Sequence, residues 1–319
     1  MSAHELSPAT ISPLLITQNA ARERQGTLLV VLGGLILATM GVFVIQAAED
    51  PITTVAFRCA FGCLSLLVWG ALTRRLPELR LRGADLLGAV ATGFLMTLSW
   101  ALHFAAIPKT SIGVSTVVFH IQPFWTMALG AWLLRENVSS AQIVAALLAF
   151  AGLVLTTGLF DGMTGAATLN SSYVTGLLLS LAGSFVYAGV PLLAKILKSV
   201  SSFALSWWQC LVGSAFTLWW PAVYGWPDGW HSITWLVGLG AIHTGLAYAV
   251  MYAGFARLST GRIAVLQFVY PMTAFIIDWQ VYDHRLSPIQ ILGLVLMGVA
   301  IWSVKGAKPM PSAEAADRI

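Results

Sequence analysis

"KTSIGVSTVVFHIQPFWT" (residues 109–126) and "RLSTGRIAVLQFVYPMTA" (residues 257–274) follow the same pattern at two places in the chain. A shift of 148 residues aligns them without a gap and carries Pro123 onto Pro271. The same shift gives further identities, which are Ser111 with Ser259, Gly113 with Gly261, Ser139 with Ser287, and Gln142 with Gln290. Identities at one constant offset over most of the chain predict an internal duplication.

The composition indicates a membrane protein. Of the 319 residues, 58% are hydrophobic and only 9% are charged, and the mean hydropathy is +0.81. Soluble domains carry about 25% charged residues, so lipid must cover much of this surface. The net charge of +4 does not indicate a nucleic-acid partner, because the basic residues lie in short connections between apolar runs.

Ten apolar runs are long enough to cross a bilayer as helices. The predicted spans are 27–47, 52–72, 84–106, 111–134, 139–158, 174–194, 202–224, 232–255, 260–282 and 287–304. Helices are expected because lipid offers no partner for backbone polar groups, and barrel strands are shorter and alternate. The predicted fold is an all-α membrane protein with a tail at 1–26, five-helix repeats at 27–158 and 174–304, and a tail at 305–319.

The basic residues indicate how the spans are oriented. With the N-terminus in the cytoplasm, the inner connections and tails hold thirteen Lys and Arg residues, and the outer connections hold only Lys109 and Arg285. This bias follows the positive-inside rule and predicts that both termini are cytoplasmic. Because five is odd, the second repeat enters the membrane from the opposite side. Inverted repeats are typical of secondary transporters, whose substrate sites lie near the midplane between the halves.

Three segments also resemble a known family. They are "AFRCAFGCLSLL" (56–67), "LRENVSSAQIVAALLAFAGLVL" (134–155) and "DHRLSPIQILGLVLMGVAIW" (283–302). In order and spacing they resemble the EamA-type repeats of the drug/metabolite transporter superfamily, and the tryptophan-rich second half is most similar to YddG-type bacterial amino-acid exporters. The resemblance implies a ten-helix, multi-pass exporter of the bacterial inner membrane, with a central cavity and broad amino-acid specificity. The second half departs from the pattern, because Ser206 aligns with Arg58.

Two prolines predict breaks in equivalent spans. Pro123 and Pro271 cannot donate to the carbonyls of Phe119 and Gln267, which frees backbone acceptors halfway across the membrane. The stripe Ser115, Phe119, Gln122, Thr126 and Gly130 aligns with Ile263, Gln267, Tyr270, Ala274 and Asp278. We therefore expect Phe119, Gln122, Gln267 and Tyr270 to face a cavity. His120 aligns with Phe268, so a bond to a neighbouring helix is favoured over contact with a ligand.

Aromatic residues recur at helical spacing in the third and eighth spans. Met96, Trp100 and Phe104 align with Thr244, Tyr248 and Tyr252. Such a stripe usually packs against lipid or other helices, but the matched positions of Trp100 and Tyr248 make a cavity equally plausible. An aromatic surface with a few amides suits the apolar side chain of a small zwitterion.

Arg58 and Asp278 are the two span charges that bear on gating. Both lie about 7 Å below the outer end of their spans, at 1.5 Å per residue. Arg58 is expected to snorkel, whereas a membrane carboxylate such as Asp278 tends to face a cavity or a partner. A structural Arg58–Asp278 pair and an outer gate both remain open. Arg262 lies near the inner end of its span and is expected to snorkel to the cytoplasm.

The pattern favours an amino-acid exporter that works by alternating access. An intramembrane enzyme would need a nucleophile–base set or metal ligands at motif spacing, and a channel would need a charged ring or a filter loop. No cofactor or metal is expected, and the expected partners are lipid and a small-molecule substrate. A phosphorylated substrate is disfavoured because Arg58 and Arg262 appear off-centre. Another small neutral metabolite or drug remains the alternative substrate, and the oligomeric state is open, with a monomer possible.

Overall fold

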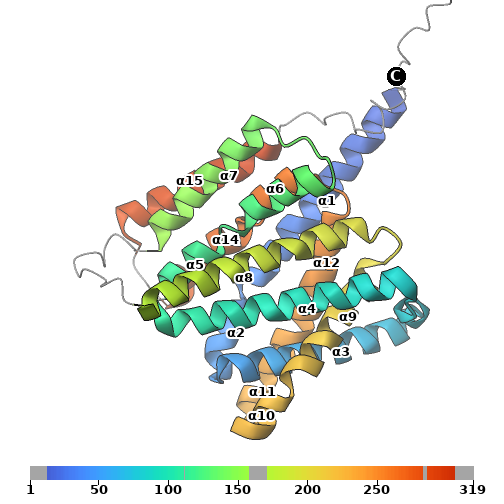
Figure 1. Cartoon of the computed structure of the whole chain (residues 1–319), viewed down its shortest axis with the longest axis vertical. Helices are drawn as coiled ribbons and strands as arrows, with labels where there is room; N and C mark the ends of the chain where they lie inside the picture. The colour runs from blue at the N-terminus through green and yellow to red at the C-terminus, as the bar shows by residue number, and fades with distance from the viewer. Residues whose placement is uncertain (1–12, 111, 158–170, 283–285, 306–319) are drawn as a thin grey trace, which may run out of the picture.

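The computed structural model describes residues 13–110, 112–157, 171–282 and 286–305, and this part of the chain contains helices and connections without a β-strand (Figure 1). The helices of the first half of the chain are α1 (Pro13–Ala38), α2 (Met40–Ala47), α3 (Pro51–Leu72), η1 (Leu76–Leu79), α4 (Gly83–Ala106), η2 (Ile107–Lys109), α5 (Ile112–Phe119), α6 (Gln122–Leu133) and α7 (Ser140–Thr156). Those of the second half are α8 (Ser171–Ile196), α9 (Ser202–Thr217), α10 (Trp219–Tyr224), α11 (Gly229–Gly238), η3 (Leu239–Leu246), α12 (Ala247–Phe255), α13 (Thr260–Leu266), α14 (Val269–Tyr282) and α15 (Pro288–Lys305).

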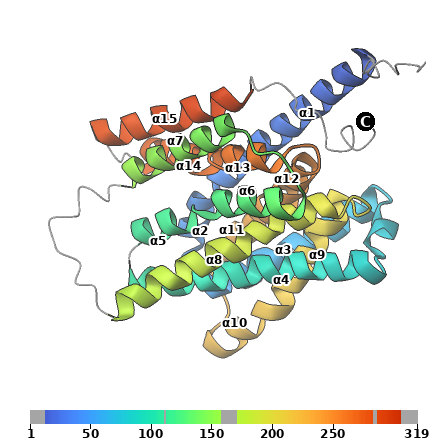
Figure 2. The same ribbon diagram turned by 45° about the horizontal axis from the view of Figure 1, so that its top comes forward.

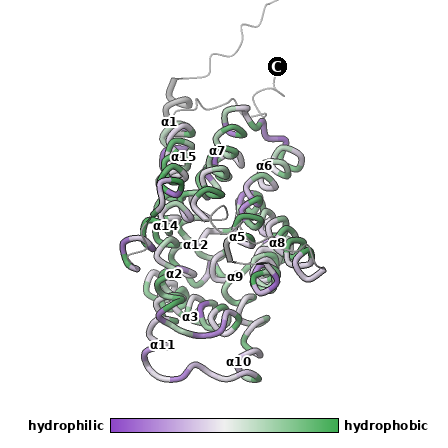
Figure 3. Tube along the Cα trace, turned by 90° about the vertical axis from the view of Figure 1, so that its left-hand side faces the viewer, coloured by the Kyte–Doolittle hydropathy of each residue, from purple (hydrophilic) through white to green (hydrophobic). Residues whose placement is uncertain are grey.

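Six helical stretches of the described chain are long and apolar enough to cross a membrane. They are Gln18–Ala47, Pro51–Leu72, Gly83–Lys109, Ser171–Ile196, Gly229–Phe255 and Thr260–Tyr282, and two shorter apolar helices are Ser140–Thr156 and Pro288–Val304. Figure 3 shows hydrophobic colour along most of the helical trace. Large apolar side chains face outward, such as Trp132, which is 75% exposed. A surface of this kind requires lipid contact.

The first helix begins before the first predicted span. α1 begins at Pro13 and so extends into the segment 1–26, which stays predicted as the N-terminal tail. The predicted C-terminal tail lies outside the described residues, apart from Lys305 at the end of α15.

α7 and α15 begin with the same side-chain arrangement. The Ser139 hydroxyl accepts from the backbone N–H of Gln142 at 3.3 Å, and the Gln142 side chain accepts from the Ser139 N–H at 3.1 Å. Ser287 and Gln290 repeat this capping box at 3.3 and 2.9 Å. A capping box satisfies two N–H groups that a helix start would leave unpaired. The residues aligned by the shift of 148 thus perform the same local task.

Helices from the two halves of the chain alternate in the packing. α7 lies along α15 at one side of the molecule (Figure 2), while α4 packs on α8, α1 on α12, and α3 on α9. Glycines permit the closest of these contacts. A Cβ at Gly152 would lie 2.5 Å from the carbonyl oxygen of Gly293, and a Cβ at Gly293 would lie equally close to that of Gly152. Any side chain at either position would force α7 and α15 apart.

Several long helices are interrupted near the middle of the molecule. α5 ends at Phe119 and α6 begins at Gln122, with Pro123 in its first turn, and α13 ends at Leu266 before α14 begins at Val269. A third interruption is the π-helix η3 in the stretch α11–α12, where the Thr244 hydroxyl donates to the Leu239 carbonyl at 3.1 Å. π-helical turns inside α-helices are frequently found at functional sites. The interruptions bring irregular backbone to the centre of the helical bundle.

Candidate functional site

A cavity of about 420 Å³ lies among the interrupted helices. Its lining includes ten of the predicted site residues, which are Arg58, Trp100, Phe119, His120, Gln122, Tyr248, Gln267, Tyr270, Pro271 and Asp278. Ile45, which is 57% exposed, also lines it, so the cavity reaches the molecular surface at the end of α2. Binding sites for small molecules have volumes of roughly 300–1,000 Å³. The volume therefore suits a metabolite.

Two predicted site residues do not line the cavity. Tyr252 is buried in the core, where its hydroxyl donates to the Gln209 side chain. Pro123 is buried beside the cavity in the first turn of α6. Tyr252 is about one helical turn from Tyr248 on α12 but lies outside the cavity lining. Helical spacing therefore predicted the face of the helix that points inward, but not how far along the helix the cavity extends.

Trp100 on α4 and Tyr248 on α12 both line the cavity, and their rings contact each other. Their ring centroids are 6.4 Å apart with an interplanar angle of 56°. Aromatic pairs at this distance contribute about 0.5–1.5 kcal/mol beyond their buried area. The two residues come from different halves of the chain, and they give the cavity a broad apolar surface.

Gln122 and Gln267 meet at the two helix breaks. The Gln122 amide nitrogen donates to the Gln267 amide oxygen. Both residues are buried, and the remaining polar atoms, Gln122 Oε1 and Gln267 Nε2, are buried without a hydrogen-bond partner. If both amides were flipped, the pair would still leave one free acceptor and one free donor. The pair can therefore bind both a donor and an acceptor group of a ligand.

Arg58 does not snorkel, because its side chain is buried, with 4% exposure, and lines the cavity. Its Nε donates to the Thr244 hydroxyl at 3.0 Å, and its guanidinium carbon lies 4.4 Å from the centroid of the Trp100 ring. This orientation differs from the snorkelling expected of Arg58, and it brings a cationic side chain to the cavity lining. Residue spacing indicates the depth of Arg58 along α3, whereas its direction around the helix depends on the neighbours of α3.

Asp278 on α14 lines the same cavity. Arg58 instead contacts Thr244 and Trp100. No ion pair joins Arg58 to Asp278 in the described part of the chain. Arg262 was expected to snorkel to the cytoplasm, but only 8% of it is exposed and it pairs with Glu23 at 2.8 Å. The Glu23 carboxylate on α1 thus takes the place of the lipid headgroup that a snorkelling arginine would contact.

His120 makes a hydrogen bond within its own helical turn rather than to a neighbouring helix. Its Nδ1 lies 2.8 Å from the Thr116 carbonyl oxygen, four residues earlier. The ring lies almost parallel to that of Tyr270, at 6.5 Å between centroids. The expected bond to another helix is therefore wrong, since the imidazole bonds the carbonyl four residues earlier in its own helical turn.

Sequence reasoning missed several lining residues, among them His103, Thr116 and Tyr187. His103 follows Trp100 by three positions, so helical spacing could have identified it. Tyr187 aligns with Thr39, and Thr116 with Ala264, under the shift of 148. Neither pairing repeats the same type of side chain in both halves, so the shift did not mark these positions as cavity lining.

One end of the molecule carries ion pairs between the two halves of the chain; we call it the charged end and define it by Glu23, Glu78, Glu136, Lys195 and Arg262. Lys195 pairs with Glu136, and Glu136 also accepts from the Thr260 N–H and hydroxyl at 2.8 and 3.0 Å. Arg262 pairs with Glu23. The connections at the right of Figure 1 belong to this end.

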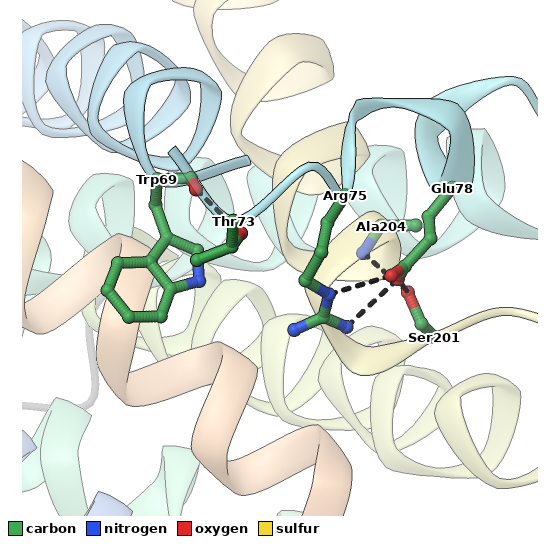
Figure 4. A network of polar contacts seen from close by, with 6 residues as sticks. All are labelled: Trp69, Thr73, Arg75, Glu78, Ser201 and Ala204. Carbon is green, nitrogen blue, oxygen red and sulfur yellow. Dashed lines mark hydrogen bonds and ion pairs between the residues drawn. The ribbon is translucent and has the colours of Figure 1, made fainter. Parts of the chain in front are cut away.

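A third polar network at the charged end joins η1 to the start of α9 (Figure 4). Arg75 donates to Glu78 from Nε and Nη2, at 2.7 and 2.9 Å, and Ser201 donates to the same carboxylate. The Ser201 hydroxyl also caps α9 by accepting from the Ala204 N–H at 3.2 Å. Because Glu78 and Ser201 lie in different halves, this network also joins the halves.

The family model named the EamA-like transporter family matches residues 24–158 and 174–305. The chain belongs to this family. A crystal structure that is 18% identical covers 87% of this chain and 96% of its own chain with a TM-score of 0.76, which at that identity shows a common fold. The EamA assignment and the apolar helices indicate a multi-pass membrane transporter rather than an enzyme.

Several curated transporters are similar to this EamA-like chain. The uncharacterized transporter YxxF of Bacillus subtilis is 26% identical over 226 residues, covering 69% of this chain and 71% of that protein. An uncharacterized transporter of Archaeoglobus fulgidus is 24% identical over 280 residues, covering 87% and 96%. One from Synechocystis is 25% identical over 240 residues, covering 68% and 67%.

Proposed function

We propose that this protein exports amino acids with neutral, mainly apolar or aromatic side chains across the bacterial inner membrane by alternating access. The observation that carries the proposal is the cavity between the halves, which combines an aromatic pair, Trp100 and Tyr248, with the partly unpaired amides of Gln122 and Gln267. A free amide oxygen suits an ammonium group, and a free amide N–H suits a carboxylate. The aromatic surface suits the side chain.

Broad specificity follows from this kind of surface. An apolar pocket separates substrates that differ by one methylene by only about 1–3 kcal/mol. Amides and aromatic rings impose no charge requirement on the substrate side chain, so leucine, phenylalanine and tryptophan are all expected substrates. A small neutral drug of similar shape is the second candidate, because the aromatic pair offers it the same surface.

The proposal includes two five-helix repeats of opposite orientation. The contact of α1 with α12 has a counterpart in that of α8 with α4, as expected if an in-plane axis exchanges the halves. The matched capping boxes and helix breaks support the same arrangement. Reporter fusions test it: residues 74–83 and both termini should be cytoplasmic, and a fusion in 74–83 that is accessible from outside would contradict the arrangement.

We further propose that the charged end faces the cytoplasm and is closed in this state. Two ion pairs and the Glu78–Ser201 bond join the halves there, whereas the cavity reaches the surface beside Ile45 at the other end. Alternating access requires these contacts to open while the other end closes around the substrate.

Transport by the purified protein in liposomes tests the function. Radiolabelled amino acids should leave the compartment on the cytoplasmic face, with rates that saturate, and the panel should be measured with and without a proton gradient. Flux that does not saturate would indicate a channel. Movement of a neutral drug or metabolite with no movement of any amino acid would replace the proposed substrate by the second candidate.

A further inference from the structure

Arg58 is held on two sides and left unpaired on a third. The Thr244 hydroxyl accepts from Nε at 3.0 Å, and the ring of Trp100 lies under the guanidinium, 4.4 Å from its carbon. The terminal nitrogen Nη2 is buried and has no hydrogen-bond partner. The side chain is thus fixed in position while part of its hydrogen-bonding capacity remains unused.

The unused capacity lies in the candidate site, because Arg58 lines the same cavity as Gln122, Gln267 and Tyr248. No ion pair between described residues includes Arg58. A guanidinium in a membrane is costly unless an anion or a set of acceptors meets it. A ligand that brings a carboxylate into the cavity would supply that anion and bond Nη2.

We propose that Arg58 is the carboxylate-binding residue of the cavity and selects substrates that carry one carboxylate. This inference rests on the proposed function and assigns the polar ends of its substrate. The carboxylate lies against the Arg58 guanidinium, and the free amide oxygen of the Gln122–Gln267 pair receives the ammonium group. Thr244 and Trp100 are positioning residues for the guanidinium.

A single arginine suffices to bind one carboxylate in one cavity. The shift of 148 residues carries Arg58 onto Ser206, which is fully buried in α9. The two halves therefore supply one guanidinium to one cavity. Arginine suits this role because its planar donors match the geometry of a carboxylate.

Three probes that differ in one group test the proposal with the purified full-length protein. L-leucine carries both charges, L-leucinamide lacks the carboxylate, and 4-methylpentanoate lacks the ammonium group. Binding is measured by calorimetry and by the shift in thermal unfolding temperature. Wild type should bind L-leucine about 10- to 100-fold more tightly than L-leucinamide, the effect of a charge-assisted contact.

Arg58→Gln should reduce this ratio to about one, and Arg58→Lys should retain part of it. Arg262→Gln is the matched control, since Arg262 is also a buried arginine but lies at the charged end; its ratio should equal that of wild type. If Arg58→Gln does not fold, wild type and Arg58→Lys still give the decisive comparison. Equal binding of L-leucine and L-leucinamide by wild type would overturn the proposal, as would an unchanged ratio in folded Arg58→Gln.

The result separates this inference from the proposed function. Leucine export by a wild type that does not discriminate against L-leucinamide would support amino-acid export and remove Arg58 from recognition. Arg58-dependent binding of 4-methylpentanoate without transport of any amino acid would support the carboxylate site and refute the proposed substrate.

Discussion

The charged end and the cavity end of this transporter differ in the bonds that join the two halves of the chain. At the charged end, carboxylates of the first half bind basic or hydroxyl groups of the second half. At the cavity end, meaning the lining of the cavity of about 420 Å³, the halves meet through the Trp100–Tyr248 rings, the Gln122–Gln267 amide pair and the Arg58–Thr244 hydrogen bond. The difference indicates that ion pairs join the halves at the charged end, while aromatic rings and single hydrogen bonds join them at the proposed substrate site.

The largest expected effect comes from removing an aromatic residue at the cavity end. Trp100→Ala removes a large apolar contact surface and the ring beneath Arg58, and such a contact is worth about 1.5–3 kcal/mol. Transport of tryptophan and leucine should fall about 10- to 100-fold more than transport of alanine. Competition assays in liposomes measure this selectivity. Trp132→Ala is the control, since Trp132 is exposed toward lipid; equal losses for all substrates in Trp100→Ala would argue against contact with the substrate side chain.

The second expected effect comes from the charged end. Glu136→Gln leaves Lys195 without its carboxylate and weakens the bonds to Thr260. Breaking a fully buried pair costs about 3–5 kcal/mol. About 2 kcal/mol is expected here, because the two side chains are 18% and 20% exposed.

Hydrogen–deuterium exchange measures the result. Amides in 134–140 and 256–262 should exchange faster in Glu136→Gln, and the added Lys195→Met should reverse part of the change by removing the unpaired cation. Exchange at wild-type rates in the single variant would indicate that other contacts close this end.

A third variant tests the amide contact within the cavity end. Gln122→Ala removes one hydrogen-bond partner, worth about 0.5–1.5 kcal/mol. The affinity for amino acids should therefore fall about three- to tenfold, by the same factor for small and for large side chains. Gln290→Ala is the control, because Gln290 caps α15 away from the cavity. A loss confined to bulky substrates would assign Gln122 to the side-chain subsite.

The smallest expected effect concerns pH at the charged end. The Arg75 hydrogen bond lowers the pKa of Glu78 below its usual value, so the pair contributes stability above that usual value and loses it as pH falls through the lowered pKa. Because both side chains are more than one third exposed to solvent, the contribution at pH 7 should stay below about 1 kcal/mol. Glu78→Gln should unfold at a lower temperature than wild type at pH 7, and the difference should vanish in acid. A difference that persists there would point to the Ser201 bond instead.

The sequence identified the local features that repeat along the chain. Ser139 and Ser287 begin helices with capping boxes, and the helices beside Pro123 and Pro271 are interrupted, because caps and proline act within one helical turn. Trp100 and Tyr248, whose matched positions made a cavity as plausible as packing, both line the cavity and contact each other. Local chemistry and internal symmetry were sufficient for these features.

The direction of Arg58 required the packing of three helices. Its partners Thr244 and Trp100 are 186 and 42 positions away along the chain, and no local pattern links them. The ion pair of Arg262 with Glu23 likewise depends on how α1 meets α13. A single sequence gives depth along a span from residue spacing, whereas direction around the span depends on neighbours that only the folded chain supplies.

The π-helix η3 makes the cavity sensitive to insertions and deletions. Each residue of an α-helix turns the chain by about 100°. Removing one residue from Leu239–Leu246 would therefore rotate Tyr248 away from Trp100, or displace Thr244 from Arg58, depending on the half of the helix that adjusts. A change in chain length of one residue, with every side chain of the cavity retained, would be enough to disassemble the proposed substrate site. Related chains that keep the cavity residues but lack the π-turn would have to align these side chains by a different helix register.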